Sequence, residues 1–114
     1  MLSDLIIFQK SYDFLLYLYP VVQKFPKNQR FVLGQRIENK TLDIIGSIVK
    51  ANSERDKLHV LNKMSVELDE LRIFIRLAKD LHFVSVHQYG ILAEKMNELG
   101  RLLSGWIKRF SSGA

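Results

Sequence analysis

Apolar residues recur along this chain at alternating steps of three and four, the spacing that keeps them on one face of an α-helix. Four segments follow this pattern. The series are Leu5, Phe8, Tyr12, Leu15, Tyr19 and Val22; Gly34, Ile37, Thr41, Ile44, Ile48 and Ala51; Leu61, Met64, Leu68, Leu71, Ile75 and Ala78; and Tyr89, Leu92, Met96, Leu99, Leu103 and Trp106. No alternating strand pattern competes with them. The sequence therefore predicts an all-α fold, an up-down-up-down antiparallel bundle of four helices of about 20 to 28 residues.

Residues that favour helix starts lie between these segments. Pro26 suits the first turn of a helix, where a missing N–H costs nothing. Ser53 with Asp56, and Ser85 with Gln88, have the spacing of a capping box, in which side chains satisfy the first backbone N–H groups. These signals predict that the second helix begins near Pro26, the third near Ser53 and the fourth near Ser85.

Three further residues carry local predictions. Pro20 lies inside the first helical pattern and predicts a kink near residues 17–20 or an early helix end. Gly34 occupies an apolar stripe, where it costs about 1 kcal/mol relative to Ala, so we expect a neighbouring helix to approach it closely. Trp106 also lies in a stripe and is expected in the core or an interface.

The first and third segments each carry a second apolar row. The rows are Ile7, Phe14, Leu18, Val21 and Phe25, and Val60, Phe74, Leu77 and Leu81. A solitary bundle needs one apolar face per helix, so two faces favour burial against another chain and a homo-oligomer. The alternative is that a small bundle leaves some apolar surface exposed. The residues predicted for the oligomer interface are Ile7, Phe14, Leu18, Val21, Phe74 and Leu77.

Length and composition limit the other possibilities. A chain of 114 residues holds one core, so we expect a single domain over residues 1–110 and a disordered tail over residues 111–114. Cysteine is absent, which excludes disulfides and thiolate metal sites. No apolar run reaches the roughly 18 residues of a membrane span, and the N-terminus lacks a signal peptide pattern. We expect a cytoplasmic protein that does not bind membranes.

The sequence has no pattern typical of an active site. His82 and His87 are five residues apart across a predicted turn, which is not the spacing of a helical zinc pair, and His59 is far along the chain. The acidic cluster at residues 67–70 lacks the Glu-x-x-His pairs of di-metal bundles. We therefore predict no catalytic residues, no metal, no cofactor and no enzymatic activity.

The net charge of +5 is unevenly distributed. Residues 26–51 hold five cations against two acids, for a net +3, and residues 83–114 hold four against two, for a net +2. A phosphate-binding face is one interpretation, with contacts to the nucleic-acid backbone, because no exposed aromatic series interleaves with the bases. The alternative is a solvated face with pairs such as Asp69–Arg72 and Arg76–Asp80. The residues predicted to bind nucleic acid or a partner are Lys27, Arg30, Arg36, Lys40, Arg72, Arg76, Lys79, Arg101, Lys108 and Arg109.

Two long stretches, residues 25–44 and 71–108, resemble the accessory variability determinant (Avd) proteins of diversity-generating retroelements. The motifs that carry the resemblance are Phe25-Pro26-Lys27, Leu33-Gly34-x-Arg36-Ile37, Arg76-Leu77-Ala78-Lys79-Asp80-Leu81, Gln88-Tyr89, Gly100-Arg101 and Gly105-Trp106-Ile107-Lys108. A related group of four-helix-bundle proteins is encoded in intervening sequences of bacterial ribosomal RNA genes. Its members carry an Asn-Ile-Ala-Glu-Gly-like run at the end of the second helix, where this chain reads Ile-Val-Lys-Ala-Asn at residues 48–52. This departure favours the Avd group.

The resemblance implies a non-enzymatic accessory protein. Avd proteins form basic, barrel-shaped homopentamers that bind a reverse transcriptase and nucleic acid during mutagenic retrohoming. The expected partners are therefore a reverse transcriptase, template RNA and, as a further ligand, DNA. The resemblance assigns no phosphate contacts, so the ten cations above rest on charge and spacing. The alternative function is a protein–protein interaction module of the intervening-sequence type.

Overall fold

The computed structural model describes residues 5–111, and all of its regular elements are helical. The elements are α1 (Ile6–Gln23), α2 (Lys27–Gln29), the π-helical segment η2 (Arg30–Gly34), α3 (Gln35–Ser53), α4 (Leu58–Asp80) and α5 (Val86–Ser111). No strand occurs within this range, so the all-α prediction is confirmed. The predicted second helix corresponds to α2, η2 and α3 in succession. No helix between residues 5 and 111 has the length and hydropathy needed to cross a membrane.

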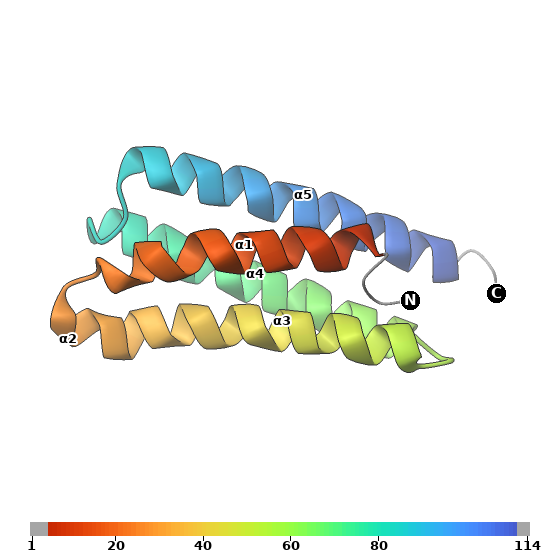
Figure 1. The fold of residues 1–114 in the computed structure, drawn as a ribbon. Helices are drawn as coiled ribbons and strands as arrows, with labels where there is room; N and C mark the ends of the chain where they lie inside the picture. Colours follow the sequence, from red (N-terminus) through yellow and green to blue (C-terminus); the bar gives the residue numbers. More distant parts are fainter. Residues whose placement is uncertain (1–4, 112–114) are drawn as a thin grey trace.

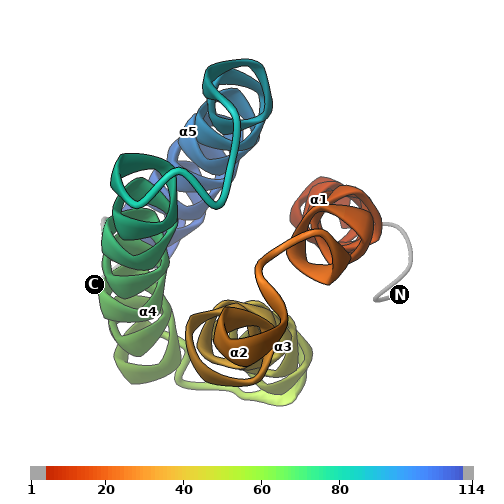
Figure 2. The same ribbon diagram turned by 90° about the vertical axis from the view of Figure 1, so that its left-hand side faces the viewer.

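The four long helices lie side by side, and successive ones run in opposite directions (Figure 1). Viewed along their axes, α3 lies between α1 and α4, and α5 lies beyond α4 (Figure 2). Residue contacts also join α1 to α5, so each long helix packs against two others. The result is an elongated body of 47 × 22 × 20 Å.

The core contains the predicted stripes of α3, α4 and α5. Ile37, Ile48, Leu61, Leu71 and Leu92 are each at most 1% exposed. The apolar stripe of each helix turns inward because its burial removes it from water.

Helix α1 packs the other way round from the prediction. Its inward row is the one expected to meet another chain, and Tyr12 and Tyr19 of the other row are 47% and 39% exposed, although Val22 of that row is buried. Four predicted interface residues are therefore buried within the chain: Ile7, Phe14, Leu18 and Val21. Their assignment to an oligomer interface is wrong, because both rows of α1 are apolar and spacing alone does not tell which faces inward.

The other two predicted interface residues lie on α4. Phe74 is partly buried against the core, and Leu77 is exposed. Their part in an oligomer interface stays a prediction. Trp106 is partly buried and packs against the core, as expected.

The helix starts are partly as predicted. At α5 the capping box is confirmed: the backbone N–H of Gln88 donates to Ser85 Oγ at 3.0 Å, and that of Ser85 donates to Gln88 Oε1 at 3.1 Å. At α4 the prediction is wrong, because the helix begins at Leu58 and Ser53 ends α3 instead. The Ser53 hydroxyl donates backwards to the Lys50 carbonyl at 3.0 Å.

The structure also bears on the predictions for Pro20, Gly34 and the C-terminal tail. Helix α1 continues through Pro20 to Gln23, so the early end is wrong, and the alternative, a kink near residues 17–20, stays a prediction. A Cβ on Gly34 would lie 2.8 Å from Val22 Cγ1, which confirms the close approach of a neighbouring helix. Ser111, placed in the predicted tail, is helical, while residues 112–114 of that tail and residues 1–4 of the predicted domain lie outside the described residues.

Candidate nucleic-acid and partner interface

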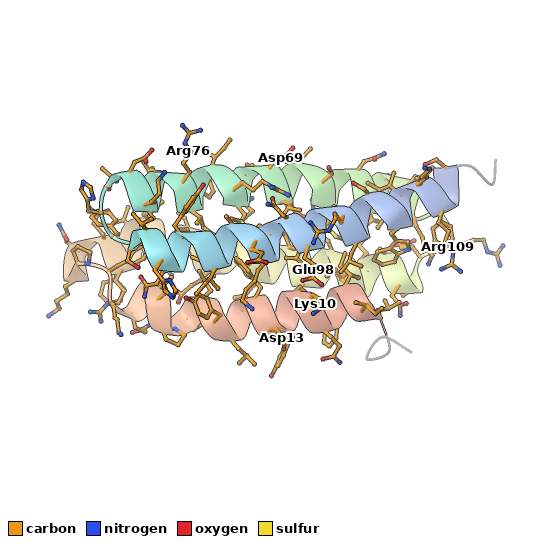
Figure 3. All side chains as sticks on the ribbon, turned by 90° about the horizontal axis from the view of Figure 1, so that it is seen from above. Lys10, Asp13, Asp69, Arg76, Glu98 and Arg109 are labelled. Carbon is orange, nitrogen blue, oxygen red and sulfur yellow. The ribbon has the colours of Figure 1, made fainter. Side chains whose placement is uncertain are left out.

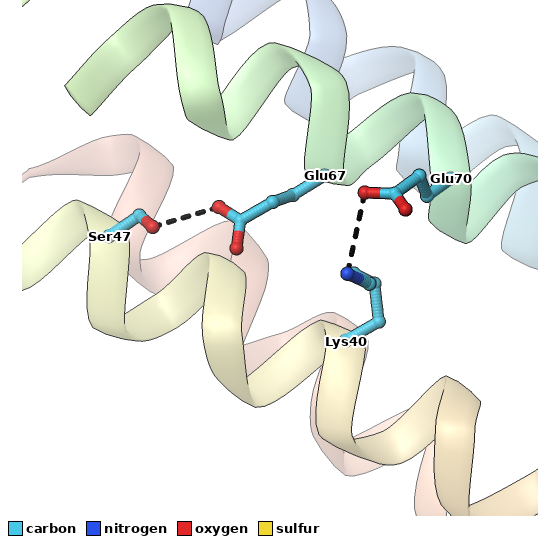
Figure 4. Close-up of polar contacts among 4 residues, drawn as sticks. All are labelled: Lys40, Ser47, Glu67 and Glu70. Carbon is cyan, nitrogen blue, oxygen red and sulfur yellow. Dashed lines mark hydrogen bonds and ion pairs between the residues drawn. The ribbon is translucent and has the colours of Figure 1, made fainter. Parts of the chain in front are cut away.

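Two basic residues of α3, Arg36 and Lys40, contact α4. Lys40 Nζ lies 3.4 Å from Glu70 Oε1, and the Lys40 side chain is only 19% exposed (Figure 4). The guanidinium carbon of Arg36 lies 5.2 Å from the centroid of the Phe74 ring, a cation–π distance. The charge surplus of residues 26–51 is therefore partly compensated by α4. Counting charges within residues 26–51 does not include this pairing, because Glu70 comes 30 residues after Lys40 in the sequence.

A buried carboxylate lies beside this pair. The Ser47 hydroxyl donates to Glu67 Oε1 at 2.8 Å, and Glu67 is 6% exposed (Figure 4). The sequence placed Glu67 in an acidic cluster and did not indicate its burial. Among the described residues, no group of three histidine or acidic side chains is arranged to hold a metal ion.

Arg72 is held between α4 and α5. Its Nη1 donates to Asn97 Oδ1 at 2.7 Å, and its Nη2 donates to the Met96 carbonyl at 3.2 Å. The predicted pair with Asp69 is absent from the ion pairs of the described residues. Arg72 is thus a half-buried, positioned cation and not a freely exposed one.

Two further predicted cations lie at the end of α4. Arg76 Nε is 3.9 Å from Asp80 Oδ2, which confirms the predicted pair, and Lys79 Nζ is 3.3 Å from Asp80 Oδ1. Lys79 Nζ also lies 4.6 Å from the centroid of the Tyr89 ring on α5. A single carboxylate serves both cations, so the end of α4 keeps a surplus positive charge.

The turn after α1 and the turn after α4 meet at one end of the molecule, which we call the turn end (residues 24–30 and 79–87). The rings of Phe25 and Phe83 pack there with centroids 5.6 Å apart. The turn end gathers four cations against the single acid Asp80, namely Lys24, Lys27, Arg30 and Lys79, together with His82 and His87. Sequence reasoning missed Lys24 and weighed the two histidines only as metal ligands.

Arg30 has an unusual place in the turn end. It opens the π-helical segment, and its Nε is buried without a hydrogen-bond acceptor among the described residues. Buried donors without partners are rare in folded proteins. The segment ends at Gly34, which packs against Val22 of α1. Because π-helical segments are found frequently at functional sites, this geometry adds to the case for the turn end as a binding surface.

The remaining predicted cations lie on the second half of α5. Arg109 packs beside the ring of Phe110, with the guanidinium carbon 5.6 Å from its centroid, and Lys57 Nζ lies 5.5 Å from the same ring. Figure 3 shows Arg76 and Arg109 toward opposite ends of the molecule. The ten predicted residues therefore do not share one face. Lys27, Arg30, Arg76 and Lys79 lie at or beside the turn end; Arg36, Lys40 and Arg72 lie between helices; and Arg101, Lys108 and Arg109 lie on the second half of α5.

One carboxyl group of α3 is perturbed. Burial raises the pKa of Glu38 above its ordinary value of 4.5. Its Oε2 atom is buried without a hydrogen-bond donor among the described residues. Desolvation without a compensating partner disfavours the charged form, which accounts for the direction of the shift.

Comparison with known proteins identifies the family. The model of the family described as bAvd-like matches residues 5–110, which is nearly the whole chain. This chain belongs to the bAvd-like family. The resemblance to Avd proteins drawn from the sequence is thereby confirmed. No curated protein matches the chain.

Two of the motifs that carry the resemblance contribute to the structure of this chain. The Phe25-Pro26-Lys27 motif forms half of the turn end, where the Pro26 carbonyl accepts the N–H groups of Gln29 and Arg30. Gly100 leaves room for Arg72, since a Cβ at position 100 would lie 2.6 Å from Arg72 Nη2. In this chain, these residues therefore shape the turn end and fix the position of Arg72.

Proposed function

We propose that this bAvd-like chain is a non-enzymatic accessory protein of a diversity-generating retroelement, a four-helix bundle that assembles into a homo-oligomer. It binds a reverse transcriptase together with template RNA, and DNA through the same phosphate chemistry. The observation that carries the nucleic-acid part is the turn end, where four cations face one acid. Membership of the bAvd-like family supports the assignment to the retroelement.

The chemistry of the turn end suits phosphates. Lysine and arginine neutralise phosphate groups and release condensed counterions, so affinity depends on charge and falls with salt. Lys27 is exposed, and the exposed Arg76 stands one helical turn before Asp80. Contacts of this kind fix the position of a nucleic acid without reading its bases.

A salt titration tests this proposal. The double variant Lys27→Glu/Arg30→Glu is compared with Lys63→Glu, an exposed charge reversal on α4 away from the turn end. Using a single-stranded RNA, we expect the double variant to lose about tenfold or more in affinity and to reduce the salt slope by about one for each lost phosphate contact. The control should bind like the wild-type protein. Equal binding by both variants would contradict a role for the turn end.

A protein-only interaction module is the second candidate. It is favoured by the intramolecular pairing of several bases, such as Lys40 with Glu70 and Arg72 with Asn97. This function predicts that Arg36→Glu and Arg76→Glu weaken capture of the reverse transcriptase and leave RNA binding unchanged. A parallel loss of both activities would favour the nucleic-acid function.

A further inference from the structure

A groove with one positioned arginine runs between α4 and α5. Two hollows of about 550 Å³ and 360 Å³ adjoin there, and Arg72 and Asn97 line both. The first extends to Ser104 and the second to Tyr89. Fifteen residues of α5 separate these two ends, which corresponds to about 22 Å at 1.5 Å per residue. We call this surface the α4–α5 groove. Of the cations argued to suit phosphates, it shares only Arg76, which stands beside the turn end.

The guanidinium of Arg72 is preorganised for an anion. Two of its N–H groups donate to Asn97 Oδ1 and to the Met96 carbonyl, and the others have no acceptor among residues 5–111. Gly100 makes this position possible, because a Cβ there would lie 2.6 Å from Arg72 Nη2. An arginine that is already held in place loses little side-chain freedom when it binds a carboxylate, and such charge-assisted bonds are strong.

The residues that line the groove indicate the chemistry of a partner that would fit it. Its charged residues are Arg72, Arg76 and Arg101 against Asp69, so it attracts anions. Its small residues on α5 are Ala93, Gly100 and Ser104, which leave space for a third helix to approach. Ile73 stands at its edge with 65% of its surface exposed, an apolar side chain that a partner would cover. Cations beside apolar surface fit a helix with one acidic and one apolar row.

A nucleic-acid strand fits this groove less well. Asp69 lies on the wall and would repel phosphates, whereas a protein partner can place a neutral or basic side chain opposite it. A sugar–phosphate backbone also offers nothing to cover Ile73. We therefore propose that the α4–α5 groove binds an acidic amphipathic helix of a partner protein, with Arg72 receiving one of its carboxylates. This inference goes beyond the proposed function and does not depend on RNA binding.

The comparison of two glycine substitutions on α5 tests whether the position of Arg72 matters for binding. Gly100→Ala forces the Arg72 guanidinium to move, whereas a Cβ on Gly90 meets nothing within 4 Å. The probe is a fluorescent amphipathic peptide of about 15 residues, the length of the groove, with Glu at one-turn intervals beside a Leu row. A matched peptide carries Gln in place of Glu. Circular dichroism melting verifies that both variants fold.

We expect the Glu peptide to bind the wild-type protein and Gly90→Ala alike, and to bind Gly100→Ala and Arg72→Gln about tenfold more weakly, the loss typical of one charge-assisted contact. The Gln peptide should show the same weakening toward the wild-type protein. Amide shifts in NMR spectra should centre on residues 72, 97 and 100. The Lys27→Glu/Arg30→Glu variant should keep peptide binding, so failure of the RNA proposal and failure of this one are separable.

Three results would overturn the inference. One is no binding of the Glu peptide at low salt. Another is equal binding by Gly100→Ala and Gly90→Ala. The third is displacement of the peptide from the same amides by a single-stranded oligonucleotide of equal charge, which would assign the groove to nucleic acid.

Discussion

At the scale of single residues, the glycines of this chain fall into two groups. Gly34 and Gly100 stand where a side chain would collide with a neighbour, while Gly46, Gly90 and Gly105 have open space around the position of a Cβ. The first two therefore serve close packing, of η2 against α1 and of Arg72 against α5. The other three lower helix stability, and in the described part of the chain no neighbouring atom packs closely against them.

This contrast gives a pair of glycine-to-alanine variants, one at a crowded position in η2 and one at an open position in α3. Gly34→Ala should lower the free energy of unfolding, because overpacking against Val22 costs about 1–3 kcal/mol and exceeds the helix-propensity gain of up to about 1 kcal/mol. Gly46→Ala should raise it by up to about 1 kcal/mol. Urea unfolding of both variants measures the difference. Changes of the same sign would contradict the packing role of Gly34.

Glu38 links stability to pH. Burial raises its pKa above 4.5, so the folded state holds the proton more tightly than the unfolded state. Ionisation therefore costs stability, and this cost appears as the pH rises from about 4.5 through the folded-state pKa. Glu38→Gln should gain stability relative to the wild-type protein between pH 4 and pH 7. Denaturant unfolding at both pH values tests this, and a constant difference between the two proteins would count against it.

At the scale of elements, side chains decide where the helices begin and end. Lys57 Nζ donates to the carbonyls of Ala51 at 2.8 Å and Glu54 at 2.7 Å, so a residue outside α3 satisfies its last turn. His82, two residues after the end of α4, has a positive φ of 65°, and the N–H of Phe83 donates to the Ala78 carbonyl at 2.8 Å. A non-glycine residue in this conformation is uncommon, and it directs the chain into the turn end.

The capping box of α5 yields a prediction for an element. Ser85→Ala removes the acceptor of the Gln88 N–H and should cost about 1 kcal/mol of stability. Ser53→Ala is the control, because its exposed hydroxyl bonds at the end of α3 and a surface change of this kind stays within about 0.5 kcal/mol. Thermal melting compares the two. An equal loss from both substitutions would mean that Ser85 is not an energetically important cap.

At the scale of the whole molecule, the outward row of α1 bears on assembly. Tyr12, Leu16 and Tyr19 follow one another at steps of four and three, and each is exposed. Contiguous apolar surface of this kind is disfavoured in an isolated protein. In the proposed homo-oligomer, this row takes the place of the four α1 residues that the sequence assigned to the interface and the fold buries.

Leu16→Lys tests the outward row. Leu16 is 59% exposed, and burying it against another copy would contribute about 1–2 kcal/mol, equivalent to roughly tenfold in the dissociation constant. The variant should shift the mass measured by light scattering toward the monomer. Val86→Lys, an exposed apolar residue outside the row, should leave the mass unchanged. A wild-type protein that stays monomeric at working concentration would refute the assembly proposal.

Predictability differed between the helices for a physical reason. Helices α3 and α5 carry one dominant apolar stripe, so the periodicity specifies both the helix and its buried face, as Ile37 and Leu92 show. Helix α4 has a second apolar row, yet its predicted stripe, which includes Leu71, is buried. Helix α1 is apolar on two sides, so its periodicity specifies the helix but not its rotation. Choosing Phe14 and Leu18 for the core requires the positions of α3 and α5, which the sequence of α1 does not contain.

The candidate site was less predictable than the fold. The sequence located the cations, and the Arg76–Asp80 pair followed from spacing along one helix. The Lys40–Glu70 pair and the contact of Arg72 with Asn97 join different helices, over 30 and 25 residues. Such pairs depend on how the helices are rotated and offset against each other. A charge count along the chain therefore overstated how many of the bases are free.

By itself, the sequence determined the helical elements, the capped start of α5 and the resemblance that the family match confirms, because each depends on residues close together in the chain or on a whole-chain pattern. Only the tertiary structure decided which row of α1 faces the core, which bases are paired, and where Arg72 is held. These outcomes depend on contacts between side chains of different helices, and the free energy of those contacts is determined only after the helices have packed.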